Sequence, residues 1–289
     1  QKRAVLTGFT ASVRRQLAKA GRPILLAARV PPSLDGCRRA GLDIAEWTRQ
    51  GLVDFLVASP FLTTDFSMPI EEMRAALGQH AVPIYAAFDI SHGDHQMHCP
   101  ESLRAAASGL YASGADGLCV FNHPCWIERL AARPYDWILG LEDPAAAASK
   151  PLLFSVAHVE KRRASGVDLP GHLPAPLAAG GRVSLPLVLP PAALPAWRCL
   201  VSVASGGGVA LSVNGAPARE RPRLQRADLF VQFENRPAPN AKPRVRIPDE
   251  ACRLFHPDPA ALKPGINILE ITNASGHNLT IERINLGLW

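Results

Sequence analysis

Short apolar runs alternate with helix-like segments through the first half of the chain. The apolar runs lie at 23–30, 53–58, 82–88 and 117–122. Strands that are apolar on both faces belong to parallel sheets covered by helices. The segment 100–112 has its apolar residues at three- and four-residue intervals, which is typical of an amphipathic helix. The pattern therefore predicts repeated βα units built on four parallel strands.

Residues that cap helices mark where the intervening helices begin. Asp43 and Glu46 have the spacing of a capping box. Ser67 is a suitable cap for a helix with Pro69 near its start, where proline is tolerated. A helix is expected before each apolar run, at about 5–20, 42–50, 67–77 and 100–112.

After residue 150 the pattern changes to short alternating runs separated by Gly and Pro. Asn214-Gly215 is a hairpin signal, and NASGHN at 273–278 forms the turn between two alternating runs. Regularly spaced short strands predict an antiparallel β-sandwich of the jelly-roll kind. The expected strands lie at 152–158, 182–189, 199–204, 208–213, 228–233, 244–247, 265–272 and 279–288.

The two patterns divide the chain into two expected domains. The alanine-rich stretch EDPAAAASK at 142–150 reads as a connector. We expect an α/β domain at 1–145 and an all-β domain at 151–289. The fold class is therefore α/β followed by all-β.

Composition narrows the range of partners. The chain of 289 residues is 47% apolar, and no apolar run approaches the roughly 20 residues of a membrane helix, so no membrane partner is expected. The net charge is +6, but the arginine-rich stretches at 219–226 and 236–253 carry no nucleic-acid motif and read as solvated basic faces. The chain starts at Gln1 and shows no signal peptide, so we expect a processed or truncated product. Its location stays open, with secreted or periplasmic as one alternative.

The six cysteines include no CxxC pair. Cys119 falls inside an apolar run and is expected to be a small core residue. Cys99 and Cys125 both follow strand ends on the same side of the expected sheet, so a disulfide between them is an alternative to free thiols. The count leaves the redox compartment open.

Four motifs near the strand ends carry a family resemblance. They are RVP at 29–31, GLDIAEW at 41–47, GLVDFL at 51–56 and GADGLCVFN at 114–122. Over roughly residues 20–130 they resemble the family-10-like glycosyl hydrolases of bacteria. The resemblance implies a TIM-type (β/α)₈ barrel followed by a β-rich C-terminal domain, and a carbohydrate substrate. The matched strands correspond to strands five to eight of such a barrel, so the resemblance implies a half-barrel.

Four parallel strands do not close a TIM barrel, which needs eight. Two partners would complete it. One is a missing N-terminal half-barrel, either lost or present as a separate chain, and the other is a second copy of this chain.

Active sites of such barrels lie at the C-terminal ends of the strands. The residues there are Arg29, Ser59, Asp89, Asn122 and His123. Asp89 is the candidate catalytic residue, as a general base, a nucleophile or an acceptor for a sugar hydroxyl; the alternative is a loop cap. Arg29 would orient a ligand hydroxyl or carboxylate, or form a salt bridge in the barrel mouth. We assign Ser59, Asn122 and His123 to substrate binding.

The loop after Asp89 is rich in histidine. It contains His92, Asp94, His95, His98 and Cys99, a density of ligands that would suit zinc or another transition metal. Sugar contact through His92 and His95, or no special role, are the alternatives, so we assign no metal and no cofactor. Trp126 would stack on a sugar ring, or else pack between the two domains.

Carboxylates at the opposite strand ends, Asp54 and Asp116, are expected to be structural. Glycoside hydrolysis usually needs two carboxylates, and related barrels place a glutamate after strand seven, where this chain reads FDIS at 88–91. Two hypotheses follow. The chain is the C-terminal part of a glycoside hydrolase-like enzyme, or it is a non-catalytic carbohydrate-binding or scaffold protein.

Overall fold

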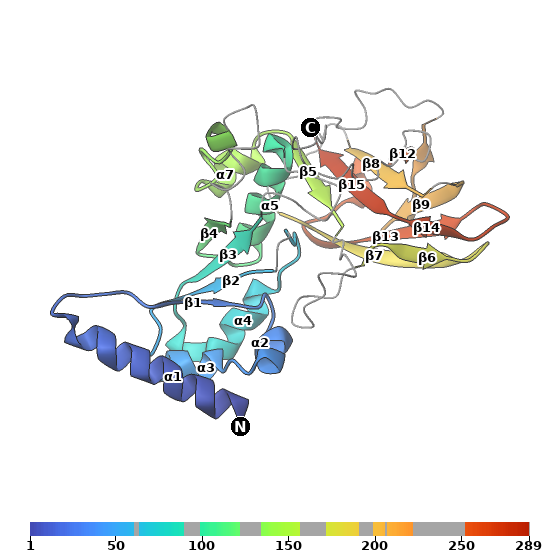
Figure 1. Cartoon of the computed structure of the whole chain (residues 1–289). Helices are drawn as coiled ribbons and strands as arrows, with labels where there is room; N and C mark the ends of the chain where they lie inside the picture. Colours follow the sequence, from blue (N-terminus) through green and yellow to red (C-terminus); the bar gives the residue numbers. More distant parts are fainter. Residues whose placement is uncertain are drawn as a thin grey trace, which may run out of the picture.

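A computed structural model of the chain describes residues 1–60, 64–89, 99–121, 134–156, 172–190, 199–205, 207–221 and 252–288. Within them a parallel sheet with helices comes first in the chain, and antiparallel sheets follow (Figure 1). The chain therefore combines α/β and β structure in the predicted order.

The first sheet contains four strands that pair in chain order, all parallel. They are β1 (Ala27–Val30), β2 (Phe55–Ala58), β3 (Ile84–Phe88) and β4 (Gly117–Val120). Each strand lies within one of the four predicted apolar runs and is shorter than that run. The four-stranded parallel pattern is confirmed.

At least one helix precedes each of the four parallel strands in the chain. The α-helices are α1 (Lys2–Leu17), α2 (Leu34–Ala40), α3 (Ile44–Arg49), α4 (Ile70–Leu77), α5 (Pro100–Ala112) and α7 (Pro144–Ala148). Short 3₁₀ turns form η1 (Ala18–Ala20), η2 (Gly78–His80) and η3 (Pro134–Trp137). Helix α5 has the predicted bounds. Helix α2 was not expected from the sequence, yet Ser33 caps it by accepting a hydrogen bond from the Gly36 N–H at 3.1 Å.

Two capping predictions have different outcomes. Asp43 caps α3 by accepting from the Glu46 N–H at 3.2 Å, but the Glu46 carboxylate bonds to Arg49 and so does not complete a capping box. The prediction that Ser67 caps α4 is wrong. Its hydroxyl and its N–H both donate to the Asp65 carboxylate, at 2.7 and 2.8 Å, and α4 begins without a side-chain cap.

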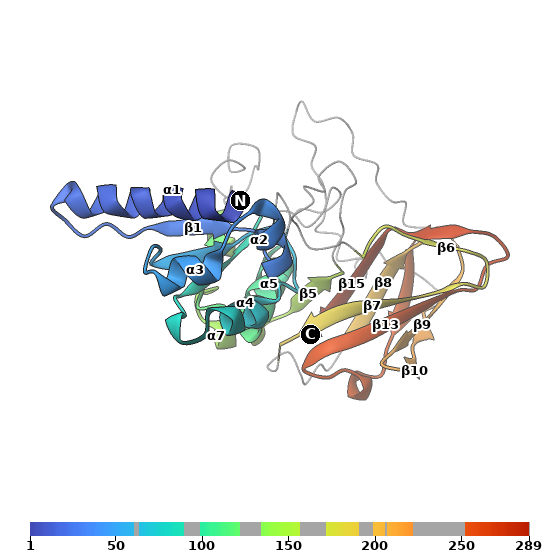
Figure 2. The ribbon, with the colours of Figure 1, turned by 90° about the horizontal axis from the view of Figure 1, so that it is seen from below.

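One face of the parallel sheet packs against the helices. Leu56, Ile84 and Phe88 point to this side and are fully buried with Met73 of α4 and Leu110 of α5. Helix α1 lies along the β1 edge of the sheet, held to α3 by a hydrogen bond from Trp47 Nε1 to Thr7 Oγ1 of 2.9 Å (Figures 1 and 2). The described helices therefore pack on one face of the sheet, and the alternate strand residues point to the other face.

The antiparallel strands form two larger sheets and a two-stranded ribbon. The sheets have the orders β10-β9-β13-β7 and β11-β12-β8-β15-β5, and the ribbon pairs β14 with β6. Figure 2 shows β7, β13 and β9 of the first sheet and β5, β15 and β8 of the second. Expected strands at 228–233 and 244–247 lie outside the described residues. The bounds are β5 (Leu152–Ser155), β6 (Ala175–Leu177), β7 (Arg182–Leu189), β8 (Cys199–Ala204), β9 (Val209–Val213), β10 (Ala216–Pro217), β11 (Arg219–Glu220), β12 (Cys252–His256), β13 (Gly265–Asn273), β14 (Leu279–Ile281) and β15 (Arg283–Leu288).

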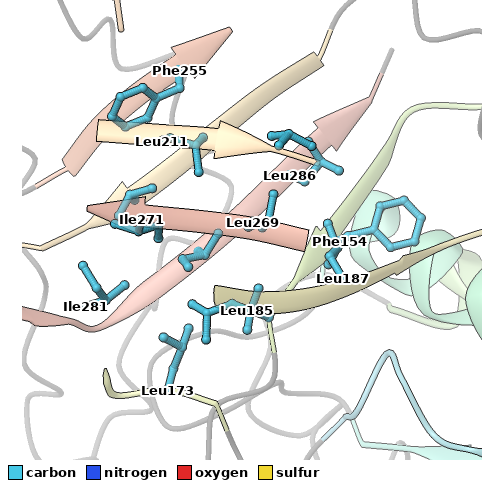
Figure 3. Close-up of a cluster of buried hydrophobic side chains, with 14 of the residues drawn as sticks. Phe154, Leu173, Leu185, Leu187, Leu211, Phe255, Leu269, Ile271, Ile281 and Leu286 are labelled. Carbon is cyan, nitrogen blue, oxygen red and sulfur yellow. The ribbon is translucent and has the colours of Figure 1, made fainter. Parts of the chain in front are cut away.

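Apolar side chains from both sheets share one core. Leu185, Leu269 and Ile271 from one sheet lie with Phe255 and Leu286 from the other (Figure 3). The predicted hairpin at Asn214-Gly215 joins β9 to β10, with φ of 50° and 86° at its two residues. The jelly-roll topology stays a prediction.

This core also reaches the first part of the chain. Ala105 and Ala106 of α5 belong to it, and the Phe66 ring meets the Phe154 ring edge-on at 6.3 Å. Arg104 donates to the Pro151 carbonyl at 2.8 and 3.1 Å, just before β5. The α/β region and the antiparallel sheets therefore pack on each other. The domain boundary at about 145–151 stays a prediction.

Candidate functional site

The N-terminal ends of the parallel strands hold two carboxylates in matching positions. Asp54 accepts from the Leu26 N–H at 2.6 Å and from Arg14 at 2.7 Å. Asp116 accepts from the Ile84 N–H at 2.7 Å and from Arg74. Each carboxylate thus ties its own strand to the start of a neighbouring strand and to an arginine of a helix. The contacts agree with a structural role.

The same contacts shift the acidity of both groups. Burial raises the pKa of Asp54, but the Leu26 N–H and Arg14 outweigh it and hold that pKa below its usual value. The pKa of Asp116 is likewise raised by burial and lowered by a larger amount through Arg74 and the Ile84 N–H. Both side chains are therefore charged partners of arginine at neutral pH and are not free for acid–base work.

The second face of the parallel sheet lies opposite the helices that the structure describes. Strand residues point alternately to the two faces, and residues paired in register point to the same side. Ala27 and Arg29 on this face are exposed, and its aromatic side chains are half-buried. The buried residues of the face are Ser59, Ala87, Asp89 and Gly117. We call it the open face. Its paired strand residues are Ala27, Arg29, Phe55, Val57, Tyr85, Ala87, Gly117 and Cys119. Continued one step past the strand ends, the same alternation adds Ser59, Asp89 and Phe121.

Aromatic side chains fill the start of the open face. The Tyr85 and Phe55 rings meet edge-on, with centroids 5.4 Å apart. Tyr85 lies over Gly117, where an added Cβ would overlap with Tyr85 Cε1. Glycine at 117 therefore makes room for the tyrosine ring.

Arg29 crosses the open face to reach Phe121. Its guanidinium carbon lies 3.7 Å from the centre of the Phe121 ring. In register Arg29 is level with Gly117, four residues before Phe121. In a flat sheet the two Cα atoms would be about 20 Å apart, given about 4.8 Å between strands and about 3.3 Å per residue. Two side chains do not bridge that distance, so the sheet curves towards its open face.

Two further sequence candidates stand at the C-terminal edge of the sheet. Ser59 follows β2, its N–H donates to the Val30 carbonyl at 2.9 Å, and its hydroxyl donates to the Pro60 carbonyl at 3.2 Å. Asp89 follows β3 and is 4% exposed. The Thr64 hydroxyl donates to the Asp89 carbonyl oxygen at 2.9 Å, which fixes the segment after β2 against the end of β3.

The remaining candidates lie outside the described residues. They are His92, His95, Asn122, His123 and Trp126. Asp94 and His98 of the histidine-rich loop also lie outside. In the described ranges, no three side chains among His, Cys, Asp and Glu come together as metal ligands, and none of the described helices is long and apolar enough to cross a membrane.

The cysteine alternatives can be separated in part. Cys99 is a free, buried thiol, so the structure does not contain the Cys99–Cys125 disulfide, and Cys125 itself lies outside the described residues. Burial raises the pKa of Cys99 to about 11, with Glu101 adding to the rise. Cys119 was expected in the core and is instead half-buried on the open face.

Sequence reasoning missed the aromatic part of this site. Tyr85 and Phe121 were counted as parts of apolar runs and not as open-face residues. The available signal was local to Tyr85, a ring with a polar hydroxyl between the buried Ile84 and Ala86; it does not continue along the strand, because Ala87 and Asp89 are 1% and 4% exposed. Asp65 was also missed, but its carboxylate is engaged by Ser67.

Similarity between this chain and known proteins is confined to a weak likeness in structure. No protein family matches this chain, and no curated protein does. Among solved structures the chain is similar to the β-porphyranase of glycoside hydrolase family 86 from the human gut bacterium Bacteroides plebeius. The identity is 10%, the TM-score is 0.29, and the match covers 99% of this chain and 74% of that one. These values show a distant structural resemblance to one glycoside hydrolase.

Proposed function

We propose that this chain binds carbohydrate on the open face of a half-barrel, as part of a glycoside hydrolase-like protein. The observation that carries the proposal is the stacking of Arg29 on Phe121 on the sheet face opposite the described helices. Ligand sites combine aromatic surface with a few directed polar groups. The open face offers Phe121 and Tyr85 as aromatic surface, with Ser59 and Asp89 at the edge where barrel enzymes bind substrate.

The half-barrel interpretation rests on the curvature and on the sheet edges. In the described part of the chain, β1 and β4 are the outer strands of the four-stranded sheet. Unpaired strand edges invite pairing with another chain. Beside the β1 edge, Val5, Phe9 and Leu25 are exposed by 65%, 66% and 71%. A second set of four parallel strands, from an N-terminal half-barrel or a second copy of this chain, would cover these surfaces.

Binding is better supported than hydrolysis by this chain alone. Asp89 is the single carboxylate on the open face as the described residues define it. Hydrolysis by two carboxylates requires a partner about 5 Å away for retention or further for inversion. The nearby Asp65 is engaged in its own turn. We therefore expect the second carboxylate of any complete hydrolase to come from the missing strands of the barrel, and no glycosidase activity from residues 1–289 alone.

Calorimetry with a panel of neutral and acidic oligosaccharides tests the proposal. We expect binding to the purified chain, and a loss of about tenfold or more in affinity in F121A, because the variant removes both the aromatic surface and the support of Arg29. The matched control is F9A, which removes an exposed phenylalanine from α1, away from the open face. Equal affinities in F121A and F9A, or no binding of any oligosaccharide, would contradict the proposal.

Product analysis on the same samples separates the two hypotheses on catalysis. Binding without new reducing ends supports a non-catalytic role for the chain by itself. Turnover that disappears in D89N would show instead that Asp89 and another group of this chain suffice. The molecular mass in solution tests the half-barrel itself. A half-barrel that is completed by a second copy should have a mass above the 31.0 kDa of one chain.

A further inference from the structure

Arg29 differs from most arginines of the α/β region in its electrostatic partners. Six of them lie within 4.0 Å of a carboxylate: Arg3, Arg14, Arg39, Arg49, Arg74 and Arg104. No carboxylate of the described residues pairs with Arg29. Its neighbour is the ring of Phe121. The fold therefore pairs most of the arginines on its described helices with carboxylates and leaves a cation on the open face.

The stacking geometry determines which part of the guanidinium remains available. The guanidinium carbon lies over the Phe121 ring, 3.7 Å from its centre, a distance at which stacking of the two faces is the favoured arrangement. The five N–H donors lie in the plane of the guanidinium and point outward along its rim. The phenylalanine ring therefore fixes the group without using its hydrogen bonds. A planar fork of this kind suits bidentate contact with an oxyanion.

The surroundings favour an anion over a neutral hydroxyl. Arg29 is exposed, and it is the one cationic side chain of the open face as defined above. The acidic residue of that face, Asp89, follows β3 four residues beyond the level of Arg29 and is 4% exposed. The net charge of +6 adds attraction at longer range for a negatively charged ligand.

We propose that Arg29, held flat on Phe121, is the subsite for an oxyanion substituent of the carbohydrate, either a uronic carboxylate or a sulfate ester. This inference rests on the proposed carbohydrate-binding function and names its substrate class. Arg29 sets specificity in this account, and it takes no part in bond breaking.

Calorimetry with matched ligands tests the inference. Each neutral oligosaccharide of the panel is compared with its C6-carboxylated form and its O-sulfated form on the full chain. We expect one charged form to bind at least tenfold more tightly than the neutral form. Whether the carboxylated or the sulfated ligand shows the gain distinguishes the two sources of the oxyanion.

Three variants identify the group responsible. R29Q should lower affinity for the charged ligand by about 10- to 100-fold and leave the neutral ligand within about threefold, because a charge-assisted hydrogen bond is lost. R29K keeps the charge without the planar fork and should fall between wild type and R29Q. R22Q removes an exposed arginine outside the open face and controls for net charge.

The failures are distinguishable. If neutral and charged ligands bind alike, or if R29Q and R22Q weaken binding equally, the oxyanion subsite is wrong while carbohydrate binding stands. If no oligosaccharide binds the wild-type chain, the proposed function itself fails and the subsite fails with it. Circular dichroism of each variant confirms that it is folded.

Discussion

Charged side chains at the two ends of the parallel sheet have different kinds of partner. At the N-terminal ends of the strands, Asp54 and Asp116 each meet an arginine and a backbone N–H. On the open face, Arg29 reaches towards the C-terminal ends of the strands and stacks on Phe121 without a carboxylate of the described residues. At the N-terminal ends the charged side chains join strands to helices. At the C-terminal ends the charge of Arg29 is available to a ligand. In barrel enzymes the first arrangement is typical of stability and the second of ligand binding.

The largest expected effect comes from removing the paired carboxylates. D54N and D116N should each lower the free energy of unfolding by about 1–3 kcal/mol, because a charged acceptor that serves two donors is lost. The two residues tie different strand pairs, so their effects should add in the double variant. Urea denaturation followed by circular dichroism measures this. Losses below about 0.5 kcal/mol would remove the distinction between the two ends.

Gly117→Ala tests the packing of the open face and should cost about 1–3 kcal/mol. Its new Cβ would overlap the Tyr85 ring, which sits between Gly117 and Phe55. The matched control is Gly8→Ala in α1, where nothing lies within 4 Å of the added Cβ; it should be neutral or stabilising, since alanine is the better helix former. Similar stability changes in the two variants would show that Tyr85 does not occupy this position.

Low pH should destabilise the fold through the two carboxylates at the N-terminal ends of the strands. The folded-state pKa values of Asp54 and Asp116 are lowered, so the stability they add is present above the unfolded value of about 3.9. It is lost as pH falls through the lower folded values. Denaturation at several pH values below 5 should show a shallower loss in the D54N/D116N double variant than in the wild type. An identical pH dependence would contradict the pairing.

The smallest stability effect is expected for Arg29. R29Q loses a cation–π contact at an exposed position, and the free energy of unfolding should fall by less than about 1 kcal/mol. The change should be smaller than that of D54N in the same denaturation experiment. A loss as large as that of D54N would mean that Arg29 is structural, and it would weaken the case for a ligand at this position.

The order of the elements was predictable from the sequence because it depends on local pattern. Apolar runs gave the four strands, and three- and four-residue spacing gave α5. Helix α2 was missed because LDGCRRA combines a glycine with polar residues, and the evidence for the helix lies in the Ser33 cap. Ser67 was misassigned because a serine before a helix serves a turn equally well.

The site was less predictable because it depends on register and curvature. Arg29 was identified from its place in a strand, but its contact with Phe121 joins residues 92 positions apart on non-adjacent strands. No local pattern encodes how far a sheet curves. The fit of Tyr85 over Gly117 has the same origin, since a glycine in GADGL reads first as a turn residue.

Hydrogen exchange with and without a bound oligosaccharide tests the central claim most directly, because it reports on both ends of the parallel sheet at once. The ligand should be the one bound most tightly in calorimetry. We predict slower exchange in peptides that contain the C-terminal strand ends, at 28–31, 57–60 and 118–121, and no change at the N-terminal ends around 51–55 and 114–116. Protection confined to the N-terminal ends or to the antiparallel sheets would contradict the account.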